Sequence, residues 1–253
     1  MRLQLCSDLH GEFMQSVDLQ RCFVRELAKG NRPKDTILVV AGDISTGIGI
    51  VPWLEAMCGT YHHVVAVFGN HDFYRSNICE FPNRVAEATI GLTNLTILDN
   101  SFDVVDDVMF MGGTLWSDCW GCAHLYASVS DYMAIEGANG SPIRTQDTLM
   151  LHDETVGFLY RAMRKMPQMK RVVVTHHMPS YRMVAPGFAN SELNPFFASH
   201  LDSMIELGKP DIWVCGHTHT SARTRIGSTE LYCNPYGYNG DNKSFDYSLV
   251  VEI

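Results

Sequence analysis

The sequence predicts an α/β fold built around a mostly parallel sheet, on three observations. Short apolar, β-branched segments alternate with segments of helical periodicity through most of the chain. These apolar segments are hydrophobic throughout, as strands covered on both faces are. After about residue 222 the pattern changes to short strands joined by turns. The alternating part implies right-handed crossovers between parallel strands, and the last part is typical of antiparallel pairing.

The individual elements follow from local patterns of apolar residues. Strands are expected at 2–6, 36–42, 63–69, 171–175 and 211–216. Helices with an apolar stripe are expected at 18–30, 51–59, 145–166 and 194–208. The C-terminal strands are expected at 222–227, 229–234 and 247–253. Between about 77 and 140 the pattern is looser, with a helix at 80–92, strands at 95–99 and 110–116, and a helix at 124–135.

The composition is that of a globular protein without an extended basic surface. Of 253 residues, 46% are hydrophobic and 19% charged, which supports one sizeable core and a single domain over 1–253. The 19 basic and 28 acidic residues give a net charge of −9, which argues against a nucleic-acid partner. No segment resembles a secretory signal or reaches the roughly 18 apolar residues of a membrane span. We therefore expect a cytoplasmic protein with no membrane partner.

The eight cysteines are irregularly spaced and do not resemble a disulfide framework. Cys119 and Cys122 form a CxxC pair, but the second pair of a zinc knuckle and the βαβ context of a redox motif are both missing. We expect reduced, structural cysteines. Thiol redox chemistry remains an alternative, which activity insensitive to chelation would support.

Side chains that can bind metals follow five of the expected strands. They are Asp8 and His10, Asp43, Asn70 with His71 and Asp72, His176 with His177, and His217 with His219. Ligands of open α/β sheets bind beyond the carboxyl ends of the strands, so these residues should gather at one edge. Glycines at 42, 69 and 216 allow the chain to turn sharply and approach a ligand closely there.

The chemistry of this set favours two metal ions. Its donors are nitrogen and oxygen only, which suits Mn, Fe, Zn or Ni. Four imidazoles and two carboxylates exceed what one tetrahedral site needs, and this indicates two divalent ions about 3.5–4 Å apart with a bridging carboxylate. The i, i+2 spacing of Asp8 with His10, and of His217 with His219, directs alternate side chains to one side of an extended backbone.

In this order the motifs resemble those of the calcineurin-like metallophosphoesterase superfamily. The matching segments are Asp8-x-His10, Gly42-Asp43, Gly69-Asn70-His71-Asp72, His176 and Gly216-His217-x-His219. Segments such as "VVVTHHMPS" and "NPYGY" resemble a branch of compact bacterial members. The resemblance implies a four-layer α/β/β/α sandwich, in which two mixed sheets are flanked by helices and the site lies along one edge.

The resemblance also implies a role for each residue. One metal ion would be held by Asp8, His10, Asp43 and His219, and the other by Asp43, Asn70, His176 and His217. Asp43 would bridge the two ions, and His71 matches the family's catalytic histidine, which is not a ligand. His177 would support a ligand or contact substrate. Arg182 would pair with a phosphate or lie in a solvated loop.

The activity that this resemblance implies is hydrolysis of a small phosphomonoester or phosphodiester by a metal-activated water. Residues 77–140 would cap the site and shape the pocket, although Trp116 and Tyr132 also suit a core role. Asp72 would orient His71 or point outward. A nuclease fits the acidic chain poorly, and "GDISTGIGI" lacks the arginine expected of a protein phosphatase. The alternative outside enzymes is a non-catalytic metal-binding regulatory module, against which the complete ligand set argues.

Overall fold

A computed structural model describes residues 1–14 and 16–253. Within these residues, strands form a five-stranded sheet of order β11-β1-β2-β3-β4 and a six-stranded sheet of order β5-β6-β7-β8-β10-β9. We call them sheet 1 and sheet 2. The strands are β1 (Arg2–Cys6), β2 (Thr36–Ala41), β3 (His63–Val67), β4 (Leu95–Leu98), β5 (Ser101–Val105), β6 (Val108–Gly113), β7 (Lys170–Thr175), β8 (Ile212–Cys215), β9 (Ala222–Ile226), β10 (Thr229–Cys233) and β11 (Val250–Glu252).

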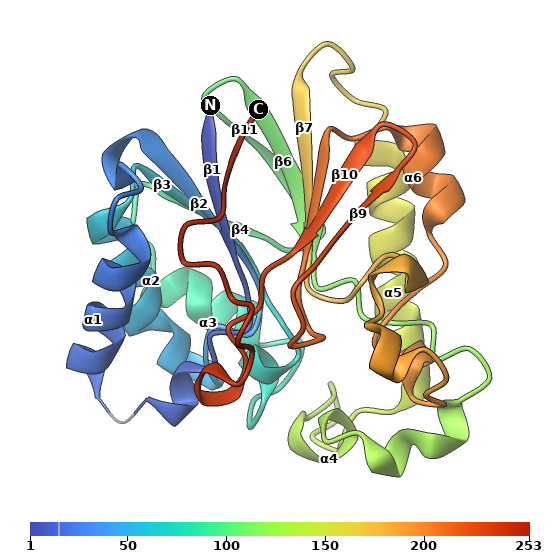
Figure 1. The fold of residues 1–253 in the computed structure, drawn as a ribbon. Helices are drawn as coiled ribbons and strands as arrows, with labels where there is room; N and C mark the ends of the chain where they lie inside the picture. Colours follow the sequence, from blue (N-terminus) through green and yellow to red (C-terminus); the bar gives the residue numbers. More distant parts are fainter. Residues whose placement is uncertain (15) are drawn as a thin grey trace.

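Helices cover the outer face of each sheet. The α-helices of the described residues are α1 (Val17–Ala28), α2 (Val51–Thr60), α3 (Phe81–Ala88), α4 (Asp131–Ala134), α5 (Thr145–Ala162) and α6 (Asp202–Gly208), of which α4 lies outside the sandwich. Figure 1 shows α1 and α2 beside sheet 1, and α5 and α6 beside sheet 2, with the two sheets facing each other between them. The predicted four-layer α/β/β/α sandwich is therefore confirmed.

Alternation along the strands explains why four layers form. In β2, Ile37, Val39 and Ala41 belong to the core between the two sheets. Leu38 and Val40 point the other way, into the core beneath the helices. Successive side chains of a strand point to opposite faces, so a strand that is apolar throughout has to be covered twice. Each fully buried side chain of this kind contributes about 1.5–3 kcal/mol relative to leaving it exposed.

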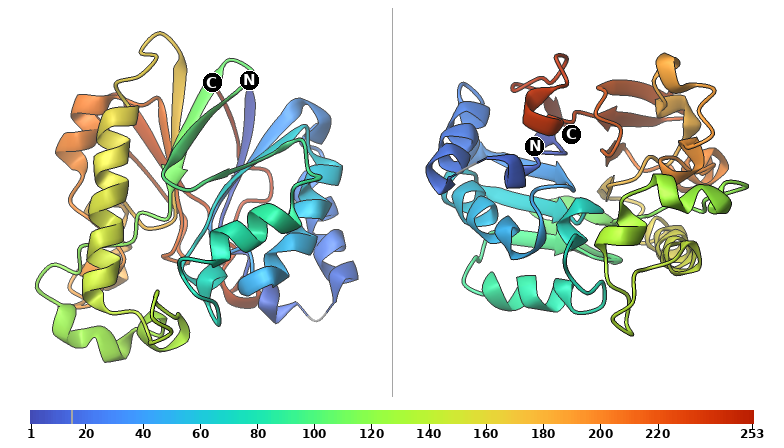
Figure 2. Two further views of the ribbon diagram at one scale, coloured as in Figure 1. Left: turned by 180° about the vertical axis from the view of Figure 1, so that it is seen from behind. Right: turned by 90° about the horizontal axis from the view of Figure 1, so that it is seen from below.

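The inner strands and the edge strand β4 pair in parallel, and the other three edge strands are antiparallel. β1, β2, β3 and β4 pair in parallel in sheet 1, as do β6, β7, β8 and β10 in sheet 2. The edge strands β11, β5 and β9 each run against their neighbours. The C-terminal part is thus only partly antiparallel, because β10 pairs in parallel with β8. Figure 2 shows the sandwich from behind and from below, towards the edge where the parallel strands end.

The structure differs from the predicted elements in three places. β5 was not predicted. The helix expected at 124–135 is a 3₁₀ segment, Ala123–Ser128, followed by the short α4. The helix expected at 194–208 begins only at Asp202, because the preceding chain is held in a loop. There the Asn194 side chain donates a hydrogen bond to the Phe188 carbonyl oxygen (2.7 Å).

The region expected to act as a cap divides into two parts. Its first part, up to residue 113, supplies α3, β4, β5 and β6 to the sandwich. Of this region, only the chain from about 114 to 144 lies outside the sheets, where α4 sits below them in Figure 1.

All eight cysteines are free thiols, as expected. Burial raises the pKa of the Cys122 thiol to about 12, which disfavours the thiolate that redox chemistry needs. Within the described chain, every helix is too short or too polar to cross a bilayer.

Candidate metal centre

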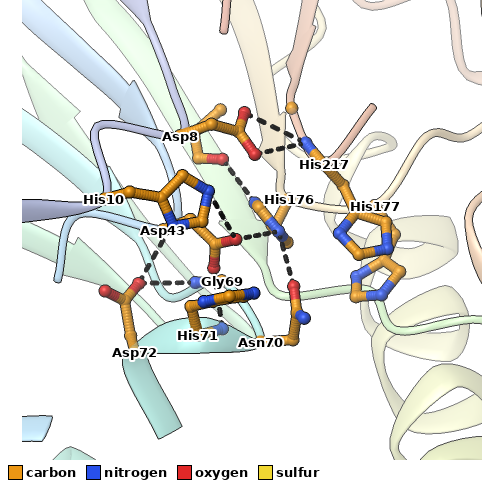
Figure 3. A network of polar contacts seen from close by, with 12 residues as sticks. Asp8, His10, Asp43, Gly69, Asn70, His71, Asp72, His176, His177 and His217 are labelled. Atoms are coloured by element: carbon orange, nitrogen blue, oxygen red, sulfur yellow. Dashed lines mark hydrogen bonds and ion pairs between the residues drawn. The ribbon is translucent and has the colours of Figure 1, made fainter. Parts of the chain in front are cut away.

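The structure brings the predicted ligands together at the edge where the two sheets meet (Figure 3). Two triplets of ligand atoms, each within 4.8 Å of one another, come from Asp8, His10 and His219 and from Asp43, His176 and His217. A third triplet, from His10, Asp43 and His71, shares His10 with the first and Asp43 with the second. Asn70 joins the second triplet, because its Oδ1 lies 2.9 Å from His176 Nε2. The seven residues come from the ends of β1, β2, β3, β7 and β8, as the sequence predicted.

Distances within the group place the Asp43 carboxylate between the two triplets. On one side, Asp43 Oδ2 lies 3.7 Å from His10 Nε2. On the other side, the same oxygen lies 3.3 Å from His176 Nε2. His10 Nε2 in turn lies 2.8 Å from His219 Nε2, and His219 Nε2 lies 3.6 Å from Asp8 Oδ1. One carboxylate oxygen therefore faces both sets of donors.

The outward ring nitrogens of two histidines are already bound to the protein. His176 Nδ1 donates to the Ala41 carbonyl oxygen at 2.8 Å. His10 Nδ1 lies 3.1 Å from Glu12 Oε1. Metal-binding histidines commonly direct one nitrogen to a carbonyl or carboxylate in this way, which leaves the other nitrogen unprotonated for the ion. The donor set and its orientation therefore fit divalent metal ions.

Five of the seven side chains start from backbone that ordinary residues rarely adopt. The φ angles are positive at Asp8 (54°), His10 (47°), Asp43 (53°), His217 (70°) and His219 (47°). Such left-handed conformations cost of the order of 1–3 kcal/mol each and cluster at functional sites. The strand-end turns thus keep an unfavourable backbone that aims these side chains at one point.

The glycines beside these residues are required by close packing. A Cβ atom at Gly69 would lie 2.1 Å from Asp43 Oδ1, and one at Gly216 would lie 2.6 Å from Asp8 Oδ2. Gly42 also has a φ of +84°, which favours glycine. The sequence predicted that the backbone at these glycines approaches a bound ligand closely. In the structure, Gly69 and Gly216 instead approach the carboxylates of Asp43 and Asp8, which form the site.

Asp72 neither orients His71 nor points outward, as the sequence had suggested. Its side chain is fully buried and accepts four backbone N–H groups, two on each oxygen, at 2.7–3.0 Å. The donors are Asp43, Ile44, Ser45 and Gly69. Burial and the nearby Asp43 carboxylate raise the pKa of Asp72 to about 8, whereas backbone hydrogen bonds lower it. Asp72 therefore ties the turn after β2 to the turn after β3.

His71 lies beside the ligands and contacts the Asp43 carboxylate through its backbone. Its N–H donates to Asp43 Oδ1 at 2.8 Å, and its ring stacks on Tyr74 with centroids 4.1 Å apart. Nδ1 lies 3.2 Å from Glu12 Oε1, and Nε2 lies 3.1 Å from the Tyr238 hydroxyl. Burial lowers the pKa of His71, but the Asp43 and Glu12 carboxylates outweigh it and raise the pKa overall. This environment favours a protonated imidazole.

Glu12 and Tyr238 were not assigned to the site from the sequence. Glu12 Oε1 contacts both His10 and His71, and although burial opposes it, these contacts lower the pKa of Glu12. Its position two residues after His10 repeats the Asp8-x-His10 spacing, a signal that could have revealed it. Tyr238 lies in the "NPYGY" segment, more than 160 residues from His71, and no local pattern indicates their contact.

A cavity of about 340 Å³ opens on this centre. Asp43, Asn70 and His71 form one wall, and the chain from Ser128 to Asp131 contributes to another. Asp131 Oδ1 accepts hydrogen bonds from Asn70 Nδ2 (2.8 Å) and from the Tyr74 hydroxyl (2.7 Å). Because the Asn70 amide nitrogen is bound in this way, its oxygen faces His176.

The remaining predicted residues lie away from this cavity. Trp116 and Tyr132 are buried in the core, as their alternative interpretation proposed. His177 is buried, with Nδ1 3.3 Å from the Thr114 carbonyl oxygen and its ring centroid 4.2 Å from that of His217. Arg182 is not among the described residues that line the cavity, and its Nε pairs with Asp202 Oδ2 at 2.8 Å. Phosphate binding by Arg182 therefore stays a prediction that this geometry does not favour.

Comparison with known proteins assigns the class. Residues 1–221 match the family model of the calcineurin-like phosphoesterases, and the chain belongs to that family. A curated relative, an uncharacterised protein of Acanthamoeba polyphaga mimivirus, is 24% identical over 99% of this chain and 96% of its own length. The bacterial branch expected from the sequence stays a prediction.

Solved structures share the fold at low sequence identity. The phosphopantetheinyl hydrolase of Mycobacterium tuberculosis superposes with a TM-score of 0.76 at 17% identity, covering 99% of this chain and 95% of that one. A protein of Staphylococcus aureus described as a 5′-nucleotidase gives a TM-score of 0.50 at 13% identity, covering 92% of this chain and 48% of that one. These likenesses show a shared metallophosphoesterase fold.

Proposed function

We propose that this protein is a dinuclear-metal phosphoester hydrolase that acts on a small phosphomonoester or phosphodiester. The observation that carries the proposal is the position of Asp43 Oδ2, 3.7 Å from His10 Nε2 and 3.3 Å from His176 Nε2. A carboxylate oxygen that faces two donor sets suits a bridge between two cations. Asp8, His10 and His219 would complete one ion's ligands, and Asn70, His176 and His217 the other's.

When bound, two divalent ions supply an activated water and neutralise the charge that develops on the phosphoryl group. Other residues of the chain orient the candidate ligands for this chemistry. Asp131 fixes the Asn70 amide so that its oxygen faces the centre. Glu12 and the Ala41 carbonyl oxygen hold the imidazoles of His10 and His176 with Nε2 directed inward.

His71 is placed to handle a proton at the leaving oxygen. It lines the cavity, and the neighbouring carboxylates raise its pKa, which favours the protonated form. Nε2 is the ring nitrogen directed towards Tyr238 at the surface side of the site, and it would donate the proton to the departing oxygen. General acid catalysis of this kind contributes about 10²–10⁴-fold. Intact His71 also supports an enzyme over a non-catalytic metal-binding module.

The substrate is proposed to be small. The cavity of about 340 Å³ is in the range of small-molecule sites, and the net charge of −9 disfavours a long polyanion. The segment Ser128–Asp131 would act as the part of the cap that shapes this pocket. A phosphopantetheinyl ester belongs among the substrates to try, because of the structural likeness to that hydrolase.

A panel assay tests the proposal. Metal-free protein is reloaded with Mn, Fe, Zn or Ni and assayed against phosphomonoesters and phosphodiesters, ranked by kcat/KM. We expect hydrolysis that a chelator abolishes and that one or more of these ions restores. Absence of turnover with every ion and substrate class would contradict the proposal.

The His71→Ala variant tests the assignment of the acid. We expect kcat to fall about 10²–10⁴-fold because the leaving oxygen loses its proton donor. Metal content, measured by plasma mass spectrometry, should stay at the wild-type level because His71 is not proposed as a ligand. His62→Ala, at a half-exposed histidine just before the start of β3 and so at the opposite end of that strand from His71, is the matched control and should behave as wild type. Metal loss in His71→Ala would remove the assigned role.

A further inference from the structure

We infer that an apolar cavity beside the candidate metal centre binds a hydrocarbon group of the substrate. The preferred substrates would then be phosphoesters whose ester group is branched or cyclic and about the size of a six-membered ring. This inference rests on the proposed function, because the bound molecule is a substrate only if the protein hydrolyses phosphoesters. The cavity itself is a separate observation, about 160 Å³ in volume.

The cavity is lined mainly by hydrocarbon side chains. Its apolar walls are Met178, Val184, Phe188, Leu193 and Phe197. The other described residues that line it are Ser191, Asn194 and Thr218, so no charged side chain among them faces its interior. An apolar cavity lined in this way does not favour a sugar hydroxyl or a second phosphate, because those groups would lose hydrogen bonds to water.

The cavity adjoins the larger one over the metal centre. Leu193, Phe197 and Thr218 line both. The Phe197 ring stacks on the imidazole of His217, with centroids 4.5 Å apart and an interplanar angle of 26°. His217 is a candidate metal ligand, so the apolar wall begins directly beside the place where a phosphoryl group would lie. The hydrocarbon group would therefore be attached within a few bonds of phosphorus.

Hydrogen bonds hold the walls in place before any ligand arrives. Asn194 Nδ2 donates to the Phe188 carbonyl oxygen at 2.7 Å, and Met178 N donates to the Phe197 carbonyl oxygen at 3.0 Å. Ser191 N also donates to the Phe188 carbonyl oxygen at 2.9 Å. The loop from 180 to 197 is thus fixed against the end of β7. A preformed cavity lowers the ordering cost of binding.

The volume sets the size of the group. Apolar protein cavities of about 150 Å³ stay dry and bind benzene. A cavity of 160 Å³ would therefore accept a cyclohexyl or phenyl ring. Each CH₂ group buried there strengthens binding about fourfold.

The experiment compares alkyl phosphates that differ only in the size of the alkyl group. Ethyl and cyclohexylmethyl phosphates, and their methyl diesters, are esters of primary alcohols with similar leaving-group chemistry. With metal-loaded protein, we expect kcat/KM to be at least about 30-fold higher for the cyclohexylmethyl ester in the series that is hydrolysed. Equal kcat/KM values would overturn the inference while leaving the proposed function intact.

Two variants locate the effect. Val184→Phe fills the cavity, and we expect the cyclohexylmethyl-to-ethyl ratio to fall below about threefold, because the ring is excluded. Phe188→Ala removes a wall that is 57% exposed and should reduce the ratio about fivefold without unfolding the protein. Val104→Phe, at an exposed position on edge strand β5, is the matched control and should keep the wild-type ratio. An unchanged ratio in both cavity variants would contradict the assignment to this cavity.

Binding measurements separate this inference from the proposed function. Ethylphosphonate and cyclohexylmethylphosphonate are not hydrolysed, and their Kd values can be measured by titration calorimetry on metal-loaded protein. We expect cyclohexylmethylphosphonate to bind at least about 30-fold more tightly. If no ester is hydrolysed but this preference is present, the proposed function fails, whereas the assignment of the cavity as a site for a hydrocarbon group stands. Equal Kd values would overturn the inference.

Discussion

The strand-end turns and the loops that wall the pocket are built differently. The turns after β1, β2 and β3 are buried, and the four N–H bonds of Asp72 join two of them. The pocket walls, at about 128–131, 180–197 and 234–242, are partly exposed, with Phe188 at 57% and Tyr238 at 40%. Burial in the sheets therefore fixes the groups proposed for chemistry, and surface loops supply those proposed for substrate selection. Substitutions in the turns should therefore reduce activity or stability most, and substitutions in the pocket walls least.

The largest effect is expected at Asp43, where the two proposed donor sets meet. Asp43→Asn should lower kcat/KM about a thousandfold or more, since a bridging carboxylate supports charge stabilisation worth several kcal/mol. Metal content should fall below two ions per chain, as measured by plasma mass spectrometry. Asp107→Asn, in the exposed turn between β5 and β6, is the control. Full occupancy with normal turnover in Asp43→Asn would contradict the bridging role.

The next effect is expected on stability, at Asp72. Asp72→Asn replaces an oxygen that accepts two N–H groups with an amide that is itself a donor, so buried donors lose their acceptor. We expect the free energy of unfolding to fall by about 3 kcal/mol, measured by urea denaturation of the metal-free protein. A loss below about 0.5 kcal/mol, the usual range for surface changes, would show that Asp72 does not tie the turns together.

Glu12 contacts histidines of the strand-end turns without being a candidate ligand itself. Its substitution should therefore have an effect on metal affinity or activity between those expected for the turns and for the pocket walls. Glu12→Gln removes the charge that faces His10 Nδ1 and His71 Nδ1, so both imidazoles lose orientation. We expect a 10–100-fold loss of metal affinity or activity, the usual range for groups that position ligands. Titration of the metal-free protein with Mn or Zn measures the affinity directly. Glu55→Gln, exposed on α2, is the matched control, and equal metal affinity and turnover in the two variants would exclude a positioning role.

The smallest effect is expected in the pocket wall. Tyr238→Phe removes the hydroxyl that lies 3.1 Å from His71 Nε2 and keeps the ring that packs on His10 and His219. One hydrogen bond of this kind is worth about 1 kcal/mol, so kcat should change about fivefold. Tyr160→Phe, on the exposed face of α5, is the control. A loss as large as that of Asp43→Asn would reverse the comparison between turns and walls.

Local patterns predicted the α/β class and the gathering of the seven candidate ligands, whereas the four-layer sandwich was implied by the family resemblance. Runs such as 36–41 are apolar throughout, and a metal-binding side chain follows each of five strands. β5 was missed because Asp103 and exposed neighbours interrupt its apolar pattern at the sheet edge. The helix at 194–208 was predicted too long because the Asn194 side chain holds a loop through the Phe188 carbonyl oxygen, six residues earlier, and helical periodicity does not reveal this contact.

Apart from Glu12, the contacts that complete the site follow from no local pattern of the sequence. Asp131 reaches Asn70 across 61 residues, and Tyr238 reaches His71 across 167. Asp72 was misjudged because the sequence shows a carboxylate next to His71 but not the four N–H groups that surround it. Tertiary packing brings these residues together, and local sequence patterns do not reveal contacts between residues so far apart in the chain.

The seven candidate ligands are divided between the two sheets, and this division has a thermodynamic consequence. Asp8, His10, Asp43 and Asn70 follow strands of sheet 1, whereas His176, His217 and His219 follow strands of sheet 2. Ions held there would fasten one sheet to the other, so that unfolding requires their release. At a free ion concentration 100 times Kd, this linkage adds about 2.7 kcal/mol to stability. At equal concentrations, the ion that binds most tightly would raise the melting temperature most, so melting temperatures would rank the ions by affinity without any substrate.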